Sequence, residues 1–133
     1  MRTLTMTANR TEEFAAALHT LEDDGDVDAF VAVFADDVEL LRPETQQQLD
    51  GIAGARDFWT QYLATFDHVS SDFSRVVDGE VGVLEWTATG RLSGGQDISY
   101  TGVSLLDFDD AGKVSRFATY FDTQAFTRPT TAS

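Results

Sequence analysis

The sequence predicts an α+β fold in which three N-terminal helices pack on a curved antiparallel sheet, forming a cone with a pocket at its mouth. Helical spacing of apolar residues is confined to the first half of the chain, at about 11–22, 26–37 and 53–66. The second half is typical of strands, at 72–77, 81–91, 100–108 and 113–123, joined by short turns. Strands that follow one another through short turns are antiparallel, and helices placed before them cover one face of the sheet.

Each expected helix has an apolar stripe, and the first two also have a start signal. Thr11 offers an N-cap to the first helix and Asp26 to the second, while the third begins at about Ala53. The second helix is expected to end near Asp36-Asp37. The three stripes are Phe14, Leu18 and Leu21; then Val27, Phe30, Val31 and Phe34; then Phe58, Tyr62, Leu63 and Phe66.

The expected strands begin with a short one at Val38–Leu41, which stops before Pro43 because proline cannot donate to a ladder. The polar segment Glu44–Gly51 is expected to be a surface loop. Asp78-Gly79 predicts a tight turn between the next two strands. The last two strands form a hairpin over 100–123. Neither of its faces is plainly polar, so we expect the hairpin at the centre of the sheet, covered on both sides.

Length and composition favour one globular domain. We expect a single domain over residues 1–133, ordered at about 11–126 with loose ends, in which Phe126 is the last anchored residue. A hydrophobic content of 42% argues against disorder. The chain has no cysteine, which excludes disulfides and thiolate metal sites. It also lacks an apolar stretch of membrane-spanning length or a secretory signal near its start, so we expect a cytoplasmic protein and no membrane partner.

Acidity is the unusual feature of the composition. Nine basic residues stand against twenty-three acidic ones, for a net charge of −14. Such a surface repels nucleic acid, so we expect no nucleic-acid partner. Two explanations of the acidity stay open. One is a composition that replaces Lys by Arg, since Lys113 is the single lysine, together with ordinary solubility. The other is adaptation to a saline cytoplasm, where screening weakens self-repulsion.

Three segments carry a resemblance to a known family. They are GDVDAFVAVFADDVEL at 25–40, GARDFW at 54–59 and GVSLLDFDDAGKVSRFATYFDTQAF at 102–126. With them the chain resembles the SnoaL-like branch of the nuclear transport factor 2-like superfamily, whose members include polyketide cyclases, ketosteroid isomerase and limonene epoxide hydrolase. The resemblance implies a cone-shaped fold and, for an enzyme, isomerisation, cyclisation or hydration without an organic cofactor. One such fold hosts many chemistries, so the substrate stays open.

The catalytic positions of ketosteroid isomerase are not kept in this chain. By the resemblance, Leu18 stands at its first-helix tyrosine, and Arg42 stands at its carboxylate base, directly before Pro43. Ser104 stands at its second aspartate. A steroid-type proton transfer needs a base and a donor that face each other, so the resemblance implies that this activity is absent.

The last strand is more similar to that of limonene epoxide hydrolase. By that similarity, its Asp-Arg-Asp relay corresponds to Thr119, Thr87 and Thr89. Hydroxyls can hydrogen-bond a ligand but do not shuttle protons as carboxylates do. We therefore predict that Thr87, Thr89, Thr119 and Phe121, with Ser104 from the neighbouring strand, line the cavity and bind a small, apolar ligand. Ordinary strand propensity is the alternative explanation of these threonines.

Catalytic and metal sites have little support in the sequence. Asp122 is the carboxylate we consider for catalysis, although it alternates against Phe121, and a structural or dimer contact is the alternative. The paired acids lie at turns, where turn chemistry explains them. His19 and His68 are isolated. We therefore expect no metal and no cofactor.

Together these features predict a small SnoaL-like homodimer, paired through the outer face of the sheet, that binds a small, largely apolar molecule in its cone cavity. As an enzyme it would be a cofactor-free isomerase, cyclase or hydratase. The alternative is a non-catalytic binding or dimerisation module. A buried carboxylate in the cavity would favour the enzyme, and a cavity filled by Phe side chains would favour the module.

Overall fold

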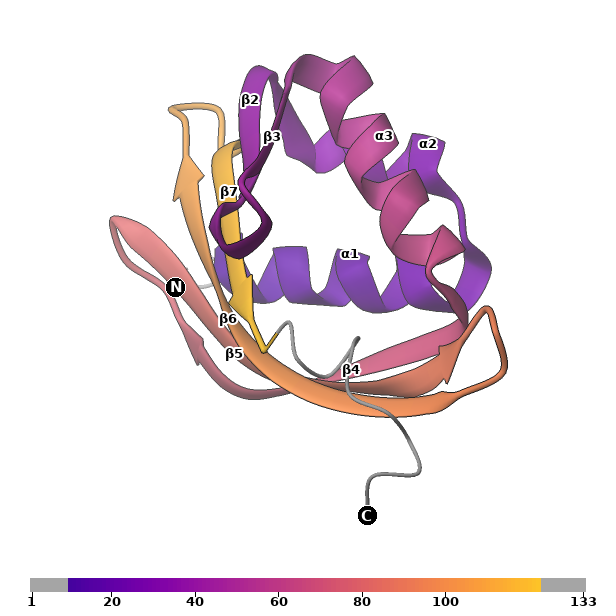
Figure 1. Cartoon of the computed structure of the whole chain (residues 1–133). Coiled ribbons are helices and arrows are strands. Elements are labelled where there is room, and N and C mark those ends of the chain that lie inside the picture. The colour runs from indigo at the N-terminus through magenta and orange to yellow at the C-terminus, as the bar shows by residue number, and fades with distance from the viewer. Residues whose placement is uncertain (1–9, 123–133) are drawn as a thin grey trace.

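The computed structural model describes residues 10–122, which form three helices, two short 3-10 turns and six strands (Figure 1). In chain order these elements are α1 (Arg10–Asp24), α2 (Val27–Phe30), a 3-10 turn (Val31–Val33), β2 (Phe34–Arg42), a second 3-10 turn (Pro43–Thr45), β3 (Gln47–Asp50), α3 (Gly51–Ala64), β4 (Phe66–Val77), β5 (Val81–Leu92), β6 (Asp97–Phe108) and β7 (Val114–Phe121).

The strands form one mixed sheet with the order β3-β2-β7-β6-β5-β4. From β4 to β7 each strand runs antiparallel to the one before it, as predicted. The prediction of a wholly antiparallel sheet is wrong, because β2 runs parallel to β7. With that pairing, β6 and β7 lie in the middle of the sheet, which confirms the central position of the hairpin. Figure 1 shows the helices inside the bend of the sheet.

Helix α1 follows its predicted stripe, since Phe14, Leu18 and Leu21 are all buried in the core. Thr11 is not its N-cap, because the helix already includes Arg10. Thr11 is instead fully buried, and its hydroxyl donates to Asp78 Oδ1 at 3.0 Å. This bond ties the start of α1 to the turn between β4 and β5.

Helix α2 is much shorter than predicted. Its N-cap is confirmed, because Asp26 Oδ1 accepts a hydrogen bond from the Ala29 amide at 3.1 Å. The chain then passes through a 3-10 turn, and β2 begins at Phe34 rather than at Val38. Phe30 and Phe34 are both buried in the core. Apolar spacing alone did not show where the helix gives way to the strand.

The segment predicted as a loop, Glu44–Gly51, contains strand β3, which pairs antiparallel with β2. The chain reverses at Gln46, which adopts the left-handed conformation at φ 59°. β3 lies at the edge of the sheet, and its side chains alternate between half-buried and exposed. Backbone pairing, rather than an apolar pattern, therefore makes this segment a strand.

The turn of the hairpin is built by Asp109, as the sequence predicted for this segment. Its Oδ1 accepts from the amides of Ala111 and Lys113, each at 2.9 Å. Gly112 supplies the positive φ of 81° that closes the turn. The register of β6 against β7 is fixed from there, with Ser104 opposite Thr119 and Gly102 opposite Phe121.

The two faces of the hairpin differ in how far their side chains are buried. On the inner face Phe117 is 3% exposed, whereas Tyr120 on the outer face is 39% exposed. Residues 10–122 therefore do not provide the expected second cover. The predictions of loose ends and of Phe126 as an anchor concern 1–9 and 123–133, outside the described residues. Within the described part, no helix is long and apolar enough to cross a membrane.

Candidate functional site

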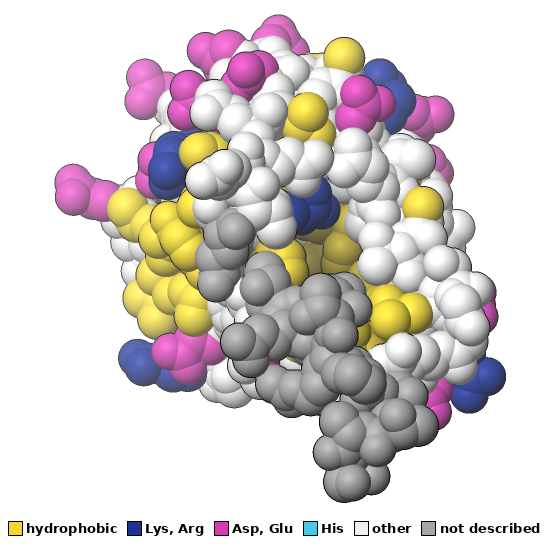
Figure 2. Space-filling view, in the orientation of Figure 1, with side chains coloured by type: hydrophobic (Ala, Val, Ile, Leu, Met, Phe, Trp, Pro, Cys, Tyr) yellow, Lys and Arg dark blue, Asp and Glu magenta, His cyan; other side chains and the backbone are white. Residues whose placement is uncertain are grey.

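A cavity of about 380 Å³ lies between the inner face of the sheet and helices α1 and α3. Figure 2 shows it as a hollow with hydrophobic side chains in its depth. Its volume falls within the range of small-molecule sites, and the Phe side chains around it do not fill it. Its apolar lining consists of Phe14, Leu18, Phe58, Trp59, Phe66, Phe73, Leu84, Trp86, Phe117 and Phe121.

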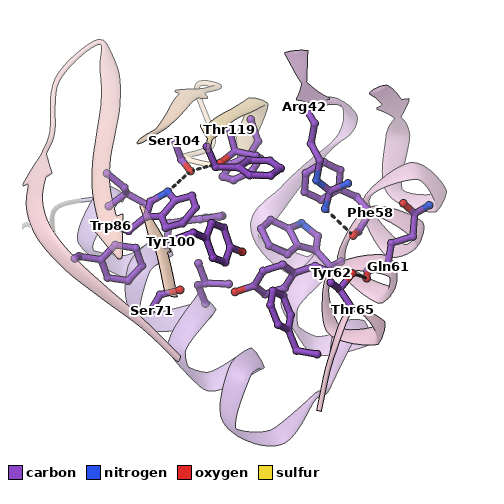
Figure 3. A pocket seen from close by; sticks show the side chains of 18 of the residues that line it. Arg42, Phe58, Gln61, Tyr62, Thr65, Ser71, Trp86, Tyr100, Ser104 and Thr119 are labelled. Atoms are coloured by element: carbon purple, nitrogen blue, oxygen red, sulfur yellow. Dashed lines mark hydrogen bonds between the residues drawn. The ribbon is translucent and has the colours of Figure 1, made fainter. Parts of the chain in front are cut away.

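A smaller set of polar side chains shares the lining, and most of them are labelled in Figure 3. Among the described residues, Arg42 is the single charged group that lines the cavity, and no carboxylate does. The polar lining consists of Arg42, Thr45, Gln61, Tyr62, Thr65, Ser71, Tyr100, Ser104 and Thr119.

Arg42 ends β2, and its guanidinium lies over the ring of Phe58, with Cζ 3.7 Å from the ring centroid. Its Nη1 donates to Gln47 Oε1, and its Nη2 makes a long contact of 3.5 Å with the Phe58 carbonyl. No described carboxylate lies within ion-pair distance of it. Burial lowers the pKa of Arg42, but a guanidinium stays protonated at physiological pH. The cavity therefore holds a positive charge that has no counter-ion among the described residues.

Tyr62 and Ser71 reach the cavity from α3 and β4 and are held by Glu22 of α1. Glu22 Oε2 accepts from the Tyr62 hydroxyl and from Ser71 Oγ, both at 2.7 Å. Its Oε1 accepts from the Ser71 amide at 2.9 Å. Burial, and then the charge of Glu22, raise the pKa of Tyr62 far above its usual value. Its hydroxyl therefore stays protonated.

Tyr100 comes from β6, and Figure 3 shows its hydroxyl and that of Tyr62 directed into the middle of the cavity. Burial raises the pKa of Tyr100, the charge of Arg42 acts against that rise, and Glu22 adds to it. The Tyr100 hydroxyl thus feels both a cation and an anion. It remains a neutral donor over the physiological range.

Ser104 and Thr119 form a hydrogen-bonded chain with Trp86 on the sheet side of the cavity (Figure 3). Trp86 Nε1 donates to Ser104 Oγ at 3.0 Å, and Ser104 Oγ lies 2.9 Å from Thr119 Oγ1. Both hydroxyls are buried. Their bond uses one of the two hydroxyl hydrogens, so the other has no acceptor among the described residues.

Of the residues predicted to line the cavity and bind the ligand, Ser104, Thr119 and Phe121 do line it, whereas Thr87 and Thr89 do not. Thr87 pairs with Thr101, and Thr89 lines a separate surface groove with His68 and Asp97. Neither threonine lines the cavity. Side chains alternate along a strand, so the inward residues of β5 are their neighbours Trp86 and Ala88.

Asp122 is exposed, directly after the end of β7, and it does not line the cavity. Its amide donates to the Thr101 carbonyl at 3.4 Å. The cavity therefore offers no support for Asp122 as a catalytic group. Within residues 10–122 no group of three or more His, Asp or Glu side chains is placed to hold a metal ion.

Arg42, Tyr62 and Tyr100 are among the cavity residues that the sequence does not predict as site residues. The resemblance to ketosteroid isomerase did point to Arg42, because the residue before Pro43 holds that enzyme's base. The sequence places Tyr62 only in the apolar stripe of the third helix, and Tyr100 only at the start of the hairpin. Their hydroxyls meet in the cavity through the fold, since α3 and β6 are far apart in the sequence.

The sequence matches the family model of the SnoaL-like domain over residues 12–117. The chain therefore belongs to the SnoaL-like family, as the resemblance implied. A search of curated proteins found no match.

Solved structures share the fold. A protein from Jannaschia sp. CCS1 that carries the provisional name SnoaL-like polyketide cyclase is 19% identical, with a TM-score of 0.79 over 100% of this chain and 99% of that one. A protein from Catenulispora acidiphila DSM 44928, with a ketosteroid isomerase-like fold and in complex with trimethylamine, is 14% identical, with a TM-score of 0.76 over 86% and 89%. SalBIII is an epoxide hydrolase/cyclase-like enzyme with a role in pyran ring formation in the polyether salinomycin. It is 16% identical, with a TM-score of 0.74 over 87% and 93%.

Proposed function

We propose that this SnoaL-like protein binds a small, largely apolar molecule carrying an oxygen function, and acts on it as a cofactor-free isomerase, cyclase or hydratase. The observation that carries the proposal is the cavity itself, an apolar space of about 380 Å³ on which a few polar groups converge. The names of its structural relatives, a cyclase and an epoxide hydrolase/cyclase-like enzyme, support the same reaction classes.

The neutral donors suit a carbonyl oxygen that gains negative charge during reaction. The Tyr100 hydroxyl and the spare hydroxyl hydrogen of Ser104 and Thr119 both face the cavity. Donors fixed in advance stabilise a developing oxyanion, because they need no reorganisation during the reaction. They would favour an enolate of the bound ketone.

The acid–base function is assigned to Tyr62 and Glu22, whose oxygens lie 2.7 Å apart. A proton that leaves the carbon next to the carbonyl passes to the Tyr62 oxygen, while the proton of Tyr62 passes to Glu22. No buried phenolate is left, which agrees with the raised pKa of Tyr62. Return of the proton to another carbon gives isomerisation, and attack of the enolate carbon on a second carbonyl gives cyclisation.

Solvent-deuterium exchange tests this proposal without knowledge of the natural substrate. A panel of small cyclic and aromatic ketones is incubated with the protein in D₂O, and loss of the proton next to the carbonyl is followed by NMR. We expect wild type to accelerate exchange of the ketones that bind, and Glu22→Gln or Tyr62→Phe to lower that rate about 100-fold or more. Glu13→Gln removes the same charge from an exposed position of α1 and should leave the rate unchanged.

The alternative is a non-catalytic binding module, and the absence of any carboxylate among the described lining residues favours it. Binding of panel members without accelerated exchange would select the module. If no ketone binds at all, both forms of the proposal are lost.

A homodimer through the outer face of the sheet is part of the proposal. Val77, Val81 and Tyr120 are exposed, and Figure 2 shows hydrophobic side chains gathered on the side of the molecule where the strands lie in Figure 1. Light scattering should give twice the 14.6 kDa chain mass. Tyr120→Glu should lower it to one chain, and Ala64→Glu, on an exposed position of α3, should not. A wild-type monomer would refute the dimer.

A further inference from the structure

We propose that the ligand is a small oxo acid, whose carboxylate pairs with Arg42 while its hydrophobic body and carbonyl occupy the rest of the cavity. This inference deepens the proposed function and rests on it, since it names the chemical class that the same cavity selects. It is carried by the balance of charge and of hydrogen-bond donors around the cavity.

The charge of Arg42 has no counter-ion within the part of the chain that the structure describes. The described lining contains no carboxylate, and Arg42 makes none of the ion pairs found in residues 10–122. The guanidinium of Arg42 instead contacts the face of the Phe58 ring, the amide oxygen of Gln47 and, at a longer distance, the Phe58 carbonyl. A partly desolvated charge without such a partner is costly to the fold, and an anionic group of the ligand would supply that partner.

The guanidinium is also held in place. Gln47 lies opposite Arg42 in the β2–β3 pairing and accepts a hydrogen bond from Nη1. The Nε2 of Gln47 donates in turn to Gln61 Oε1 at 2.9 Å. Arg42 is therefore fixed by β3, and through β3 by α3, before any ligand arrives. Fixed, planar guanidinium groups suit carboxylates, which they bind through two parallel hydrogen bonds.

Several hydrogen-bond donors around the cavity have no acceptor among the described residues. The contacts of Arg42 engage Nη1 and Nη2 once each, and a guanidinium has five N–H donors. Trp59 Nε1 is buried and has no acceptor among the described residues. One hydroxyl hydrogen of Ser104 and Thr119 is also unused. A carboxylate is acceptor-only, and a carbonyl accepts as well, so an oxo acid supplies acceptors for the unused N–H groups of Arg42 and for the spare hydroxyl hydrogen.

The described lining contains a single cation, which limits the charge of the ligand. Arg42 can balance a monocarboxylate, whereas a phosphate dianion would leave net negative charge in an apolar space. The net charge of −14 opposes any anion at long range. At physiological ionic strength, however, exposed charges are screened beyond about 8 Å, and the Arg42 site is partly shielded from solvent. The preference for an anion is thus local to the cavity.

The test compares matched ligands that differ in charge. The probes are 4-oxo-4-phenylbutanoate and its amide, and cyclohexylacetate and its amide, titrated by calorimetry at pH 7 and 0.15 M NaCl. We expect each carboxylate to bind wild type about tenfold or more tightly than its amide, as charge-assisted hydrogen bonds do. Arg42→Gln should abolish the preference and leave the amides bound about as before.

Arg75→Gln is the control, because Arg75 pairs with Glu85 outside the cavity, and its loss changes the net charge equally. The Arg75→Gln variant should prefer each carboxylate over its amide as strongly as wild type does. Equal affinity of wild type for carboxylate and amide overturns the inference while the proposed function stands, and this comparison needs no variant. A preference that survives in folded Arg42→Gln also overturns it. If neither member of any pair binds, the proposed function and this inference fail together.

Discussion

Thr119 lies at the inner end of the hydrogen-bonded chain from Trp86 through Ser104, and it can be changed with little change in volume. Thr119→Val removes its hydroxyl and keeps its shape, so we expect the fold to be retained. A ketone that binds wild type should bind the variant about 1 kcal/mol more weakly, which is the net value of one hydrogen bond. The measurement is a calorimetric titration with cyclohexyl methyl ketone, alongside a melting curve.

Thr89→Val is the matched control for this change. Thr89 is an exposed residue of β5 that lies outside the cavity. The Thr89→Val variant should bind the ketone with the same affinity as wild type. Equal binding by wild type and Thr119→Val would show that the Thr119 hydroxyl does not contact the ligand.

Individual residues also show which side chains could be assigned to the cavity from the sequence alone. Thr119 and Phe121 were placed correctly, because Phe117 and Phe121 mark the inner face of β7. The sequence of β5 does not indicate which of its faces is the inner one, since Val83 and Leu84 are both apolar yet lie on opposite faces. The alignment of Thr87 and Thr89 therefore slipped by one residue. The group of unused donors around Arg42 arises only when β2, β3 and α3 come together, so no local pattern could show it.

Among the elements, those with strong local signals were predicted well, and those made by pairing were not. The hairpin, α1 and α3 have clear turns or apolar stripes and lie within a few residues of where they are expected, although Phe66 of the expected third stripe begins β4. β3 is short and polar, and it becomes a strand because its backbone pairs with the edge of β2. The parallel contact of β2 with β7 joins residues far apart in the sequence. Neither pairing leaves a local pattern.

Hydrogen exchange should distinguish the centre of the sheet from its edge. Strands β6 and β7 each have a hydrogen-bonded strand on both sides, whereas β3 has one neighbour. We expect amides in the hairpin to exchange near the limit set by global unfolding, and those of β3 to exchange much faster through local opening. Exchange is read by NMR or by mass spectrometry of peptides. Equal rates in β3 and β7 would contradict the central role of the hairpin.

The molecule as a whole carries a large excess of negative charge. Figure 2 shows acidic side chains distributed around the edge of this face. The ion pairs within residues 10–122 are Arg56–Asp28, Arg75–Glu85 and Arg91–Asp97. They are exposed, and such pairs stabilise a fold little. Most acidic groups therefore repel one another without local compensation.

Salt should relieve this repulsion. The Debye length is about 30 Å at 0.01 M and about 3 Å at 1 M, so surface charges interact far less at high salt. We expect the melting temperature to rise clearly between low salt and 1 M KCl, as measured by circular dichroism or calorimetry. A flat or falling melting temperature over that range would refute adaptation to salt and leave composition as the explanation of the acidity.

Both tryptophans of the chain, Trp59 and Trp86, line the cavity. Intrinsic fluorescence excited at the indole band therefore comes from the walls of the site and from nowhere else. The two indoles also differ, since Trp86 Nε1 is hydrogen-bonded and Trp59 Nε1 has no partner among the described residues. Entry of a ligand should change their emission, and Trp86→Phe would leave Trp59 as a single reporter. The protein thus carries an optical probe with which compound collections can be screened without a label.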